Sequence, residues 1–329
     1  MNFQNIVPVE RSKHYLELAF RKAREKSGKK LGGEWIDKIK RKEMIKLDVV
    51  KEDLVSRLDK VVKEFPSLDH LSDFYKELLR LTLDYAGLKK SLGGVNWALG
   101  KIRFLHRDYV RKVAKSHEAG KIKGLSKEFY GRISSIMRQV DKNLIFLEES
   151  RKMMRKYPDV KDMITVCIFG FPNVGKTTLL NKLTPAQGKV AAYAFTTTLI
   201  NSGFMKFGEE KVQVLDVPGT LARVDKMNDI EKIAHLVVQE LADVIVYVFD
   251  LSERCGYSVK QQEQLLKQLT EKKVLIYLSK KDLIDGNEVK EFVRAHKNWK
   301  IFSLEELKKE LQGDFLINPV KGKRFKRKE

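Results

Sequence analysis

Residues 170–177 read Gly-Phe-Pro-Asn-Val-Gly-Lys-Thr, which matches the pattern G-x-x-x-x-G-K-[ST] at every fixed position. A short apolar run at 164–169 precedes this motif, and a helix-like stretch at 178–183 follows it. Glycines allow the backbone to wrap around phosphate groups, so that amide N–H groups and the start of the helix face the anion. The spacing therefore predicts a phosphate-binding loop between a strand and a helix.

Two side chains of this loop contribute chemistry beyond that of the backbone. Lys176 is positioned to reach the β- and γ-phosphates of a nucleoside triphosphate, and the Thr177 hydroxyl to ligate Mg²⁺. The residues that we expect to surround the phosphates are Gly170, Phe171, Pro172, Asn173, Val174, Gly175, Lys176, Thr177 and Thr178.

A second motif, Asp216-Val-Pro-Gly219, ends the next apolar run, at 212–215. The Asp216 carboxylate can hold a metal ion through a water molecule, and the Gly219 amide can face a γ-phosphate. Alone, Asp-x-Pro-Gly would be an ordinary turn. Downstream of a phosphate-binding loop, it predicts a metal ligand and a phosphate sensor.

A third motif, Ser279-Lys280-Lys281-Asp282, follows the apolar run at 274–278, in the place where guanine-binding proteins carry N-K-x-D. Asp282 can accept hydrogen bonds from guanine N1 and from the 2-amino group, which adenine cannot offer. Ser279 is shorter than the usual Asn, so we expect affinity to change and the choice of base to be kept. A solvent-exposed run of charges is the other interpretation. The order of the three motifs predicts an unpermuted GTPase. The segment 279–282, and the lack of a recognisable acceptor site for a phosphoryl group, disfavour an ATPase or a kinase.

The 329 residues carry a net charge of +21, which is unevenly distributed. Residues 1–160 hold 37 basic and 22 acidic side chains, residues 161–320 hold 22 and 21, and residues 321–329 hold six and one. Basic groups displace counterions from phosphates, so nucleic acid is the expected partner of the N-terminal half and the tail. Charges that only solubilise helices, or that reflect adaptation to heat, would raise both signs together.

Basic side chains gather in clusters within these two regions. In the first cluster, arginines four residues apart share one helix face. Such surfaces follow a phosphate backbone and do not read a base sequence. The RNA-binding residues that we expect are Arg103, Arg107, Arg111, Lys112, Lys115, Arg151, Lys152, Arg155, Lys156, Lys321, Lys323, Arg324, Lys326, Arg327 and Lys328.

Several classes of protein are disfavoured by composition. Even the longest apolar runs, such as 244–249, are far shorter than the roughly 20 residues of a membrane span. Two cysteines, Cys167 and Cys255, are too few for a disulfide framework or a cysteine zinc site. Residues 1–13 lack the apolar core of a signal peptide. We therefore expect a cytoplasmic protein without a membrane partner.

The apolar pattern changes at about residue 160. Before it, positions such as Leu54, Leu58 and Val61 recur at helical spacing, and glycines at 93–94 and 120–124 are expected to separate helices. After it, short apolar runs alternate with helix-like stretches, as in a parallel sheet covered on both faces. We predict an all-α helical bundle domain at 1–160, an α/β P-loop GTPase domain with a mostly parallel sheet at 161–320, and a basic tail at 321–329.

Further segments resemble a known family. The three motifs, together with Tyr193-Ala-Phe-Thr-Thr197 and Asp250-Leu-Ser-Glu-Arg-Cys-Gly256, resemble the Obg-like GTPases. Phe65-Pro-Ser-Leu-Asp69, His70-Leu-Ser-Asp-Phe-Tyr75 and the stretch after residue 131 are similar to the helical domain of the nucleolar GTP-binding protein 1 (Nog) family. The resemblance spans nearly the whole chain. The end of the chain, after the GTPase domain and a basic tail, is as expected for an archaeal-type member.

The resemblance implies a GTP-binding factor in assembly of the large ribosomal subunit, bound to rRNA through its helical domain and extremities and monomeric away from the ribosome. It implies that Thr197 is a further Mg²⁺ ligand and that Ser303 and Leu304 lie near the base. Lys176, Thr197 and Gly219 are then the catalytic residues. Thr220 follows Gly219 where Ras-type proteins place a glutamine that orients water, so we expect slow hydrolysis without an activator.

Three questions stay open at this stage. Asn173 is either a ligand of a potassium ion beside the phosphates, as in some related G proteins, or only a residue that shapes the loop. The chain could instead be an RNA-binding scaffold with structural GTP and negligible turnover. It could also be a GTPase that acts on tRNA or translation factors.

Overall fold

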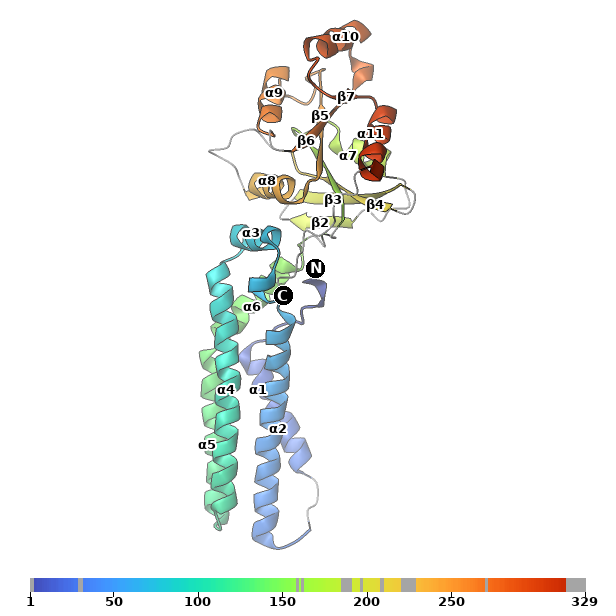
Figure 1. Cartoon of the computed structure of the whole chain (residues 1–329). Helices are drawn as coiled ribbons and strands as arrows, with labels where there is room; N and C mark the ends of the chain where they lie inside the picture. Colours follow the sequence, from blue (N-terminus) through green and yellow to red (C-terminus); the bar gives the residue numbers. More distant parts are fainter. Residues whose placement is uncertain are drawn as a thin grey trace. The chain divides into compact units, whose positions relative to one another are not determined.

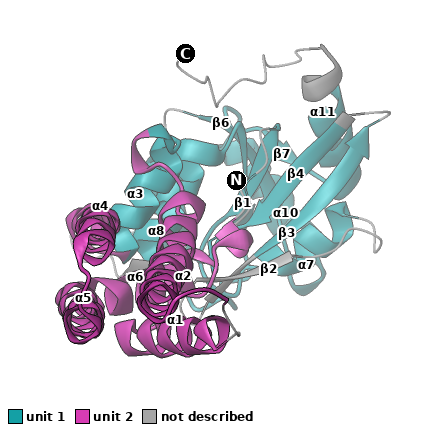
Figure 2. Cartoon of the chain, turned by 90° about the horizontal axis from the view of Figure 1, so that it is seen from below, with its two compact units in different colours: residues 1, 70–82, 156–329 teal, residues 2–69, 83–155 magenta. Residues whose placement is uncertain are grey.

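The computed structural model of the chain describes residues 3–28, 32–157, 160, 163–184, 191–195, 198–207, 210–219, 229–269 and 272–317. The chain forms two compact units. Residues 2–69 and 83–155 make up the helical unit, and residues 1, 70–82 and 156–329 make up the sheet unit (Figure 2).

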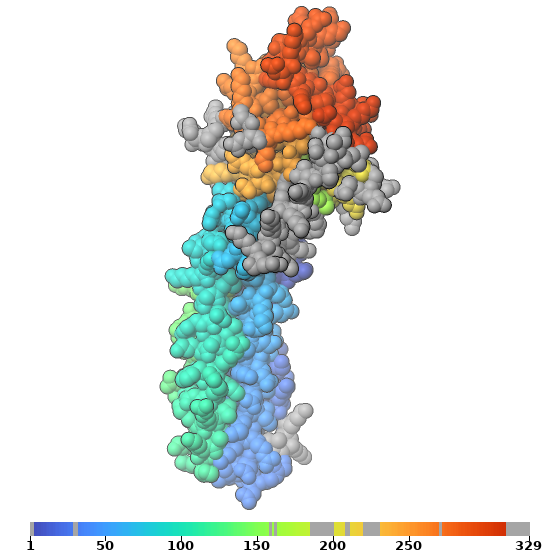
Figure 3. Space-filling view, viewed as in Figure 1, coloured from blue at the N-terminus to red at the C-terminus, as the bar shows by residue number. Residues whose placement is uncertain are grey.

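The helical unit is a bundle of long antiparallel helices (Figure 1). Apolar side chains such as Leu47, Leu54 and Leu58 are fully buried and lie on one face of their helix because they are three or four residues apart. Figure 3 shows two of the helices, α2 and α4, side by side along one face of the unit. The helices are α1 (Ser12–Ser27), α2 (Trp35–Glu64), α4 (Tyr85–Lys115), α5 (Ala119–Gln139) and α6 (Asp141–Met154). The prediction of an all-α N-terminal domain is therefore confirmed.

The glycines at 93–94 and 120–124 do not separate helices, which corrects the sequence prediction. Gly93 and Gly94 lie within α4, and Gly120 and Gly124 lie within α5. A side chain on Gly94 would collide with the amide of Asn143 on α6, so this glycine permits close packing of two helices. The connection between α4 and α5 falls instead at residues 116–118.

The sheet unit is built on one seven-stranded sheet with the strand order β2-β3-β4-β1-β5-β6-β7. Neighbouring strands from β4 to β7 are parallel, and β2 and β3 add an antiparallel hairpin beside β4. Every residue of the central strands β1 and β5 is buried, as expected when helices cover both faces. The strands are β1 (Thr165–Phe169), β2 (Ala191–Phe195), β3 (Thr198–Phe207), β4 (Glu210–Asp216), β5 (Val244–Phe249), β6 (Lys273–Leu278) and β7 (Ile301–Phe302).

Most of the helices of the sheet unit alternate with its strands, as the sequence pattern predicts. They are α7 (Lys176–Leu183), α8 (Asp229–Leu241), α9 (Val259–Lys267), α10 (Gly286–Ala295) and α11 (Leu304–Ile317), with the short helix η4 (Lys281–Leu283). The fold of a P-loop GTPase domain with a mostly parallel sheet is therefore confirmed.

One further helix of the sheet unit, α3 (Asp73–Thr82), comes from the N-terminal half of the sequence. It packs against α8 and buries Phe74, Leu78 and Leu79. The neighbouring Tyr75 hydroxyl accepts a hydrogen bond from the Val160 amide at 3.1 Å. The chain thus enters the sheet unit twice, and the domain boundary near residue 160 stays a prediction.

No helix in the described ranges is long and apolar enough to cross a membrane.

Candidate functional site

The phosphate-binding loop connects β1 to α7, as predicted, and two of its glycines are required by geometry. Gly170 has a φ of +147° and Gly175 a φ of +98°. A Cβ atom on Gly170 would also lie 2.7 Å from the Val248 carbonyl oxygen. Residues with side chains rarely adopt such φ angles, so glycine is needed at both positions for the backbone to form the loop.

Lys176 is the first residue of α7, and its side chain folds back over the loop. It is only 8% exposed, and its Nζ donates hydrogen bonds to the carbonyl oxygens of Gly170 (3.2 Å) and Phe171 (2.7 Å). Burial lowers the pKa of Lys176 to about 8, and the charge of Asp216 opposes that change. A buried ammonium group that donates to carbonyl oxygens gains strongly from an anionic hydrogen-bond partner, which suits a phosphate group.

The two predicted metal ligands, Thr177 and Asp216, lie in direct contact. The Thr177 hydroxyl donates a hydrogen bond to Asp216 Oδ2 at 2.5 Å. Asp216 is 6% exposed, and burial raises its pKa, whereas the bond from Thr177 and the charge of Lys176 lower it. Hydroxyl and carboxylate oxygens are the hard ligands that Mg²⁺ prefers, so the pair fits the expected ion.

Asn201 is a further member of this cluster that the sequence did not indicate. It lies opposite Asp216 in the antiparallel pairing of β3 with β4, and its Nδ2 donates a hydrogen bond to Asp216 Oδ2 at 3.3 Å. The third predicted ligand, Thr197, lies outside the described residues, as does Thr220.

Gly219 lies against the phosphate-binding loop. A Cβ atom at this position would be 2.5 Å from the Pro172 nitrogen, so only glycine permits this approach. The two motifs are therefore close together although they are more than 40 residues apart. This placement is what a phosphate sensor requires, because its amide must come within reach of the terminal phosphate.

The predicted base-reading segment follows β6 and borders the same loop. Ser279 is buried, and its hydroxyl donates a hydrogen bond to the Phe249 carbonyl oxygen at 3.2 Å. A Cβ atom on Gly175 would lie 3.7 Å from the Cβ of Ser279, which places the serine beside the phosphate-binding loop. Asp282 is exposed in η4, and no hydrogen bond or ion pair to it is found among the described residues. Its carboxylate can therefore accept hydrogen bonds from a base.

Asp250 holds this segment in place. It is fully buried at the end of β5 and accepts hydrogen bonds from the amides of Ser252 and Cys255, each at 3.0 Å. Its Oδ2 also pairs with Lys280 Nζ at 2.7 Å. Burial would raise the pKa of Asp250, but the bonds from Lys280 and Ser252 hold it below the ordinary value. The family resemblance pointed to this stretch, whereas residue spacing alone did not assign Asp250 a role.

Ser303 and Leu304 lie where β7 leads into α11. The Ser303 amide donates to Glu306 Oε2 at 2.8 Å, and the Glu306 amide donates to Ser303 Oγ at 3.3 Å. These reciprocal bonds cap the start of the helix. A role for the two residues near the base stays a prediction.

The basic residues predicted to bind RNA fall into three groups. Arg103, Arg107 and Arg111 are exposed on α4 with Lys112 and Lys115, whereas the residues of the tail at 321–329 lie outside the described residues. Lys152, Arg155 and Lys156 are also exposed. Arg151 differs, which corrects the prediction: it is buried, and its Nε and Nη2 donate to Glu148 at 2.7 Å each. Arg151 therefore supports the packing of the helical unit and is not available to a phosphate.

Comparison with protein families gives two matches. Residues 3–161 match the family described as the NOG1 N-terminal helical domain. Residues 165–280 match the family described as 50S ribosome-binding GTPase.

Similar proteins are found in archaea and eukaryotes. An uncharacterized protein of Methanocaldococcus jannaschii is 36% identical over 260 residues, which are 78% of this chain and 73% of that protein. Nucleolar GTP-binding protein 1 of Drosophila melanogaster is 30% identical over 301 residues, 89% of this chain and 46% of that protein. The protein of that name from Encephalitozoon cuniculi is 30% identical over 290 residues, which are 86% of this chain and 55% of that protein. The chain spans about half the length of these two nucleolar GTP-binding proteins.

Proposed function

Because the chain belongs to the nucleolar GTP-binding protein 1 (Nog) family of Obg-like GTPases, we propose that it hydrolyses GTP while it acts in assembly of the large ribosomal subunit. We propose that the helical unit docks on rRNA and that the protein works in the cytoplasm, as a monomer when it is away from the ribosome.

The observation that carries the GTPase proposal is the convergence of three motifs around one loop. Lys176 donates to two backbone carbonyl oxygens, which β- and γ-phosphate oxygens of GTP would replace. Gly219 presents its amide beside Pro172, and Asp282 presents an exposed carboxylate to the guanine ring. Thr177 and Asp216 would hold Mg²⁺, whose charge stabilises the negative charge that develops on the phosphate oxygens.

Hydrolysis by this chain alone is proposed to be slow. The residue after Gly219 is Thr220, whose side chain is too short to orient the attacking water as a glutamine does. The chain's own residues would then suffice to bind GTP. Hydrolysis would need a further source of positive charge beside the phosphates. A potassium ion held with the help of Asn173, or an activating partner, would supply that charge.

Docking on rRNA is supported by the charge of the helical unit. Residues 1–160 carry a net charge of +15, and Arg107 and Arg111 are exposed on α4. No ion pair is found for either arginine within the described ranges, so both can contact phosphates without first breaking a bond to a carboxylate.

The test is co-sedimentation of the purified full chain with large ribosomal subunits and their precursors, with a non-hydrolysable GTP analogue or with GDP. We expect binding to large-subunit particles that depends on the nucleotide, and GTP turnover that rises when the particles are added. Binding without turnover would favour a scaffold with structural GTP. Equal binding to small subunits, or binding only to free tRNA or translation factors, would contradict the proposed role.

A further inference from the structure

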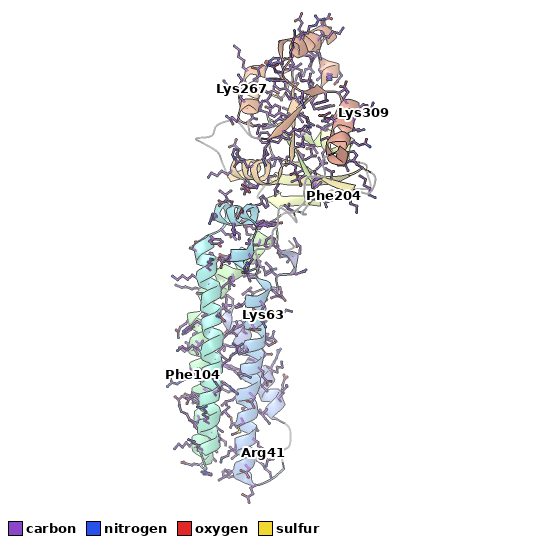
Figure 4. All side chains as sticks on the ribbon, viewed as in Figure 1. Arg41, Lys63, Phe104, Phe204, Lys267 and Lys309 are labelled. Carbon is purple, nitrogen blue, oxygen red and sulfur yellow. The ribbon has the colours of Figure 1, made fainter. Side chains whose placement is uncertain are left out.

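A groove of about 490 Å³ lies between α2 and α5 of the helical unit and is rich in lysines. Helix α2 contributes Trp35, Lys42 and Lys46 to its lining, and helix α5 contributes Lys123 and Lys127. The residues on each helix are four, seven or eleven positions apart, so they share one face of that helix. Arg41, labelled in Figure 4, marks the level of the groove near the start of α2. None of these lysines belongs to the clusters expected to bind RNA.

Trp35 is the most exposed large apolar side chain among the described residues, at 66%. Exposure of an indole ring to water is unfavourable, and covering its apolar surface with a bound molecule would lower the free energy. A flat aromatic face beside several ammonium groups is the combination that binds an unstacked base together with its phosphates.

The floor of the groove carries polar groups for which no hydrogen-bond partner is found among the described residues. Ser126 is only 3% exposed, and its hydroxyl and that of Tyr130 are buried and unpaired. Burial raises the pKa of Tyr130 to about 12, and the charge of Glu43 contributes to the rise, so the phenol keeps its proton and can donate a hydrogen bond. Buried hydroxyls without a partner are uncommon and are costly unless a bound molecule satisfies them.

We propose that this groove binds one unpaired nucleotide of an RNA strand, with the base stacked on Trp35 and the adjoining phosphates on Lys42, Lys123 and Lys127. The hydroxyls of Ser126 and Tyr130 then bond to polar atoms of the base or the ribose. Double-stranded RNA does not fit, because its bases are stacked on one another and its grooves do not present a free ring face. This site rests on the proposed docking of the helical unit on rRNA, and specifies an unpaired nucleotide as the element it recognises.

The experiment measures binding of the full chain to a fluorescent 12-nucleotide single-stranded RNA and to the same strand in a duplex. Trp35→Ala is expected to weaken binding to the single strand about tenfold and to the duplex less than twofold, because stacking of a base on an aromatic ring accounts for a loss of this order. Trp35→Tyr should restore binding, whereas Trp35→Leu, which is apolar but has no ring, should not. Indole fluorescence should be quenched on binding in the wild type and much less in Trp35→Tyr.

The paired change Lys123→Ala and Lys127→Ala should reduce the slope of log affinity against log salt by about 1.4, at about 0.7 for each phosphate contact on a single strand. If wild type binds RNA but Trp35→Ala or Trp35→Leu binds the single strand equally well, the groove does not bind a base, although docking stands. If an acidic peptide competes with the single strand as well as unlabelled RNA does, the groove is a peptide site. If the wild type binds no RNA, the proposed docking fails as well.

Discussion

The nucleotide site of the sheet unit and the basic surface of the helical unit use charge in opposite ways. In the nucleotide site, Lys176, Asp216 and Asp250 are buried, and each makes at least two hydrogen bonds to backbone or side-chain groups. On the helical unit, Arg107 and Arg111 are exposed and lie on a helix face that is open to solvent. Figure 4 shows Phe104, also exposed, pointing outward from this same helix.

This difference predicts how the activity of each region should respond to mutation. A buried charge acts through its geometry, and its electrostatic interactions are strong because water is excluded. An exposed basic side chain contributes to RNA affinity by releasing counterions from a phosphate. Each such residue contributes a similar amount, which depends on the salt concentration. We therefore expect steep losses from single changes in the nucleotide site, and graded losses from changes on the helical unit.

The largest effect is expected from Lys176→Ala. The variant lacks the ammonium group that the loop carbonyl oxygens now hold, so the rate of GTP hydrolysis should fall about 10²–10³-fold. Single-turnover hydrolysis with saturating GTP measures this rate. Lys182→Ala, on the exposed face of the same helix, is the control and should keep the wild-type rate. Similar rates in both variants would mean that the loop is not the site of hydrolysis.

The next effect concerns the choice of base. Asp282→Asn replaces a carboxylate oxygen, which accepts a hydrogen bond from the 2-amino group of guanine, by an amide NH2 that donates to the 2-oxygen of xanthine. The preference for GTP over xanthosine triphosphate should therefore fall at least about 100-fold. Competition binding with fluorescent nucleotides measures this ratio, with Glu288→Gln, an exposed residue of α10, as the control. Wild-type protein that binds ATP as tightly as GTP would contradict the assignment of Asp282.

A smaller effect is expected from the cation. Asn173 is exposed with a left-handed φ of +61°, a conformation that Asn tolerates better than most residues. If it helps to hold potassium, single-turnover hydrolysis should be about tenfold faster in potassium than in sodium at equal ionic strength, and Asn173→Ala should abolish the difference. Equal rates of the wild type in the two salts would leave an activating partner as the source of stabilisation.

On the helical unit, the double change Arg107→Ala and Arg111→Ala should lower RNA affinity only several-fold. It should reduce the slope of log affinity against log salt by about 1.4–1.8, the share of two phosphate contacts. Arg151→Ala is the informative contrast, because its half-buried partner Glu148 would keep only the longer ion pair with Lys152, at 3.8 Å. This variant should lose about 2–3 kcal/mol of unfolding free energy. Its salt slope should not change; a change would place Arg151 at the RNA surface after all.

The smallest effect is a dependence of stability on pH within the helical unit. Asp141 accepts hydrogen bonds from Arg11 Nη2 at 2.6 Å and from the Ser12 amide at 2.8 Å, and the bond from Arg11 is the main reason that its pKa is lowered to about 2. Because this pKa is below the unfolded value near 3.8, the contribution is full above pH 4 and is lost as the pH falls toward 2. Asp141→Asn should cost about 1–2 kcal/mol at pH 7 and much less at pH 2, measured by urea unfolding. An equal cost at both pH values would remove the charge from the explanation.

The sequence predicted the nucleotide site better than it predicted the connections around it. Gly170, Gly175 and Lys176 were predictable because a phosphate-binding loop permits few residues at fixed positions. Asn201 was not, because its role depends on the register of β3 against β4, which is set by tertiary pairing. Arg151 was misread because charge alone does not reveal whether a side chain is paired and buried.

The same limit explains the errors in the fold. Central strands such as β1 and β5 were visible as continuous apolar runs, because both of their faces are buried. The hairpin of β2 and β3 was not predicted. The apolar residues of β2 are mostly alanines, and those of β3 are interrupted by Asn201, Ser202 and Lys206. The glycines at 93–94 were expected to end a helix, but Gly94 serves the packing of α4 against α6, which no local pattern shows.

The placement of α3 has a consequence for the time course of biosynthesis. This helix buries Phe74 and Leu78 in the sheet unit, yet its partner α8 is synthesised about 150 residues later. At roughly 5–20 residues per second, the ribosome takes about 8–30 s to make that stretch. During this interval, α3 lacks its partner α8, although α1 and α2, which contact one another, can already fold. A nascent chain of this protein should therefore be most sensitive to chaperones and proteases within residues 70–82, between the emergence of α3 and that of α8.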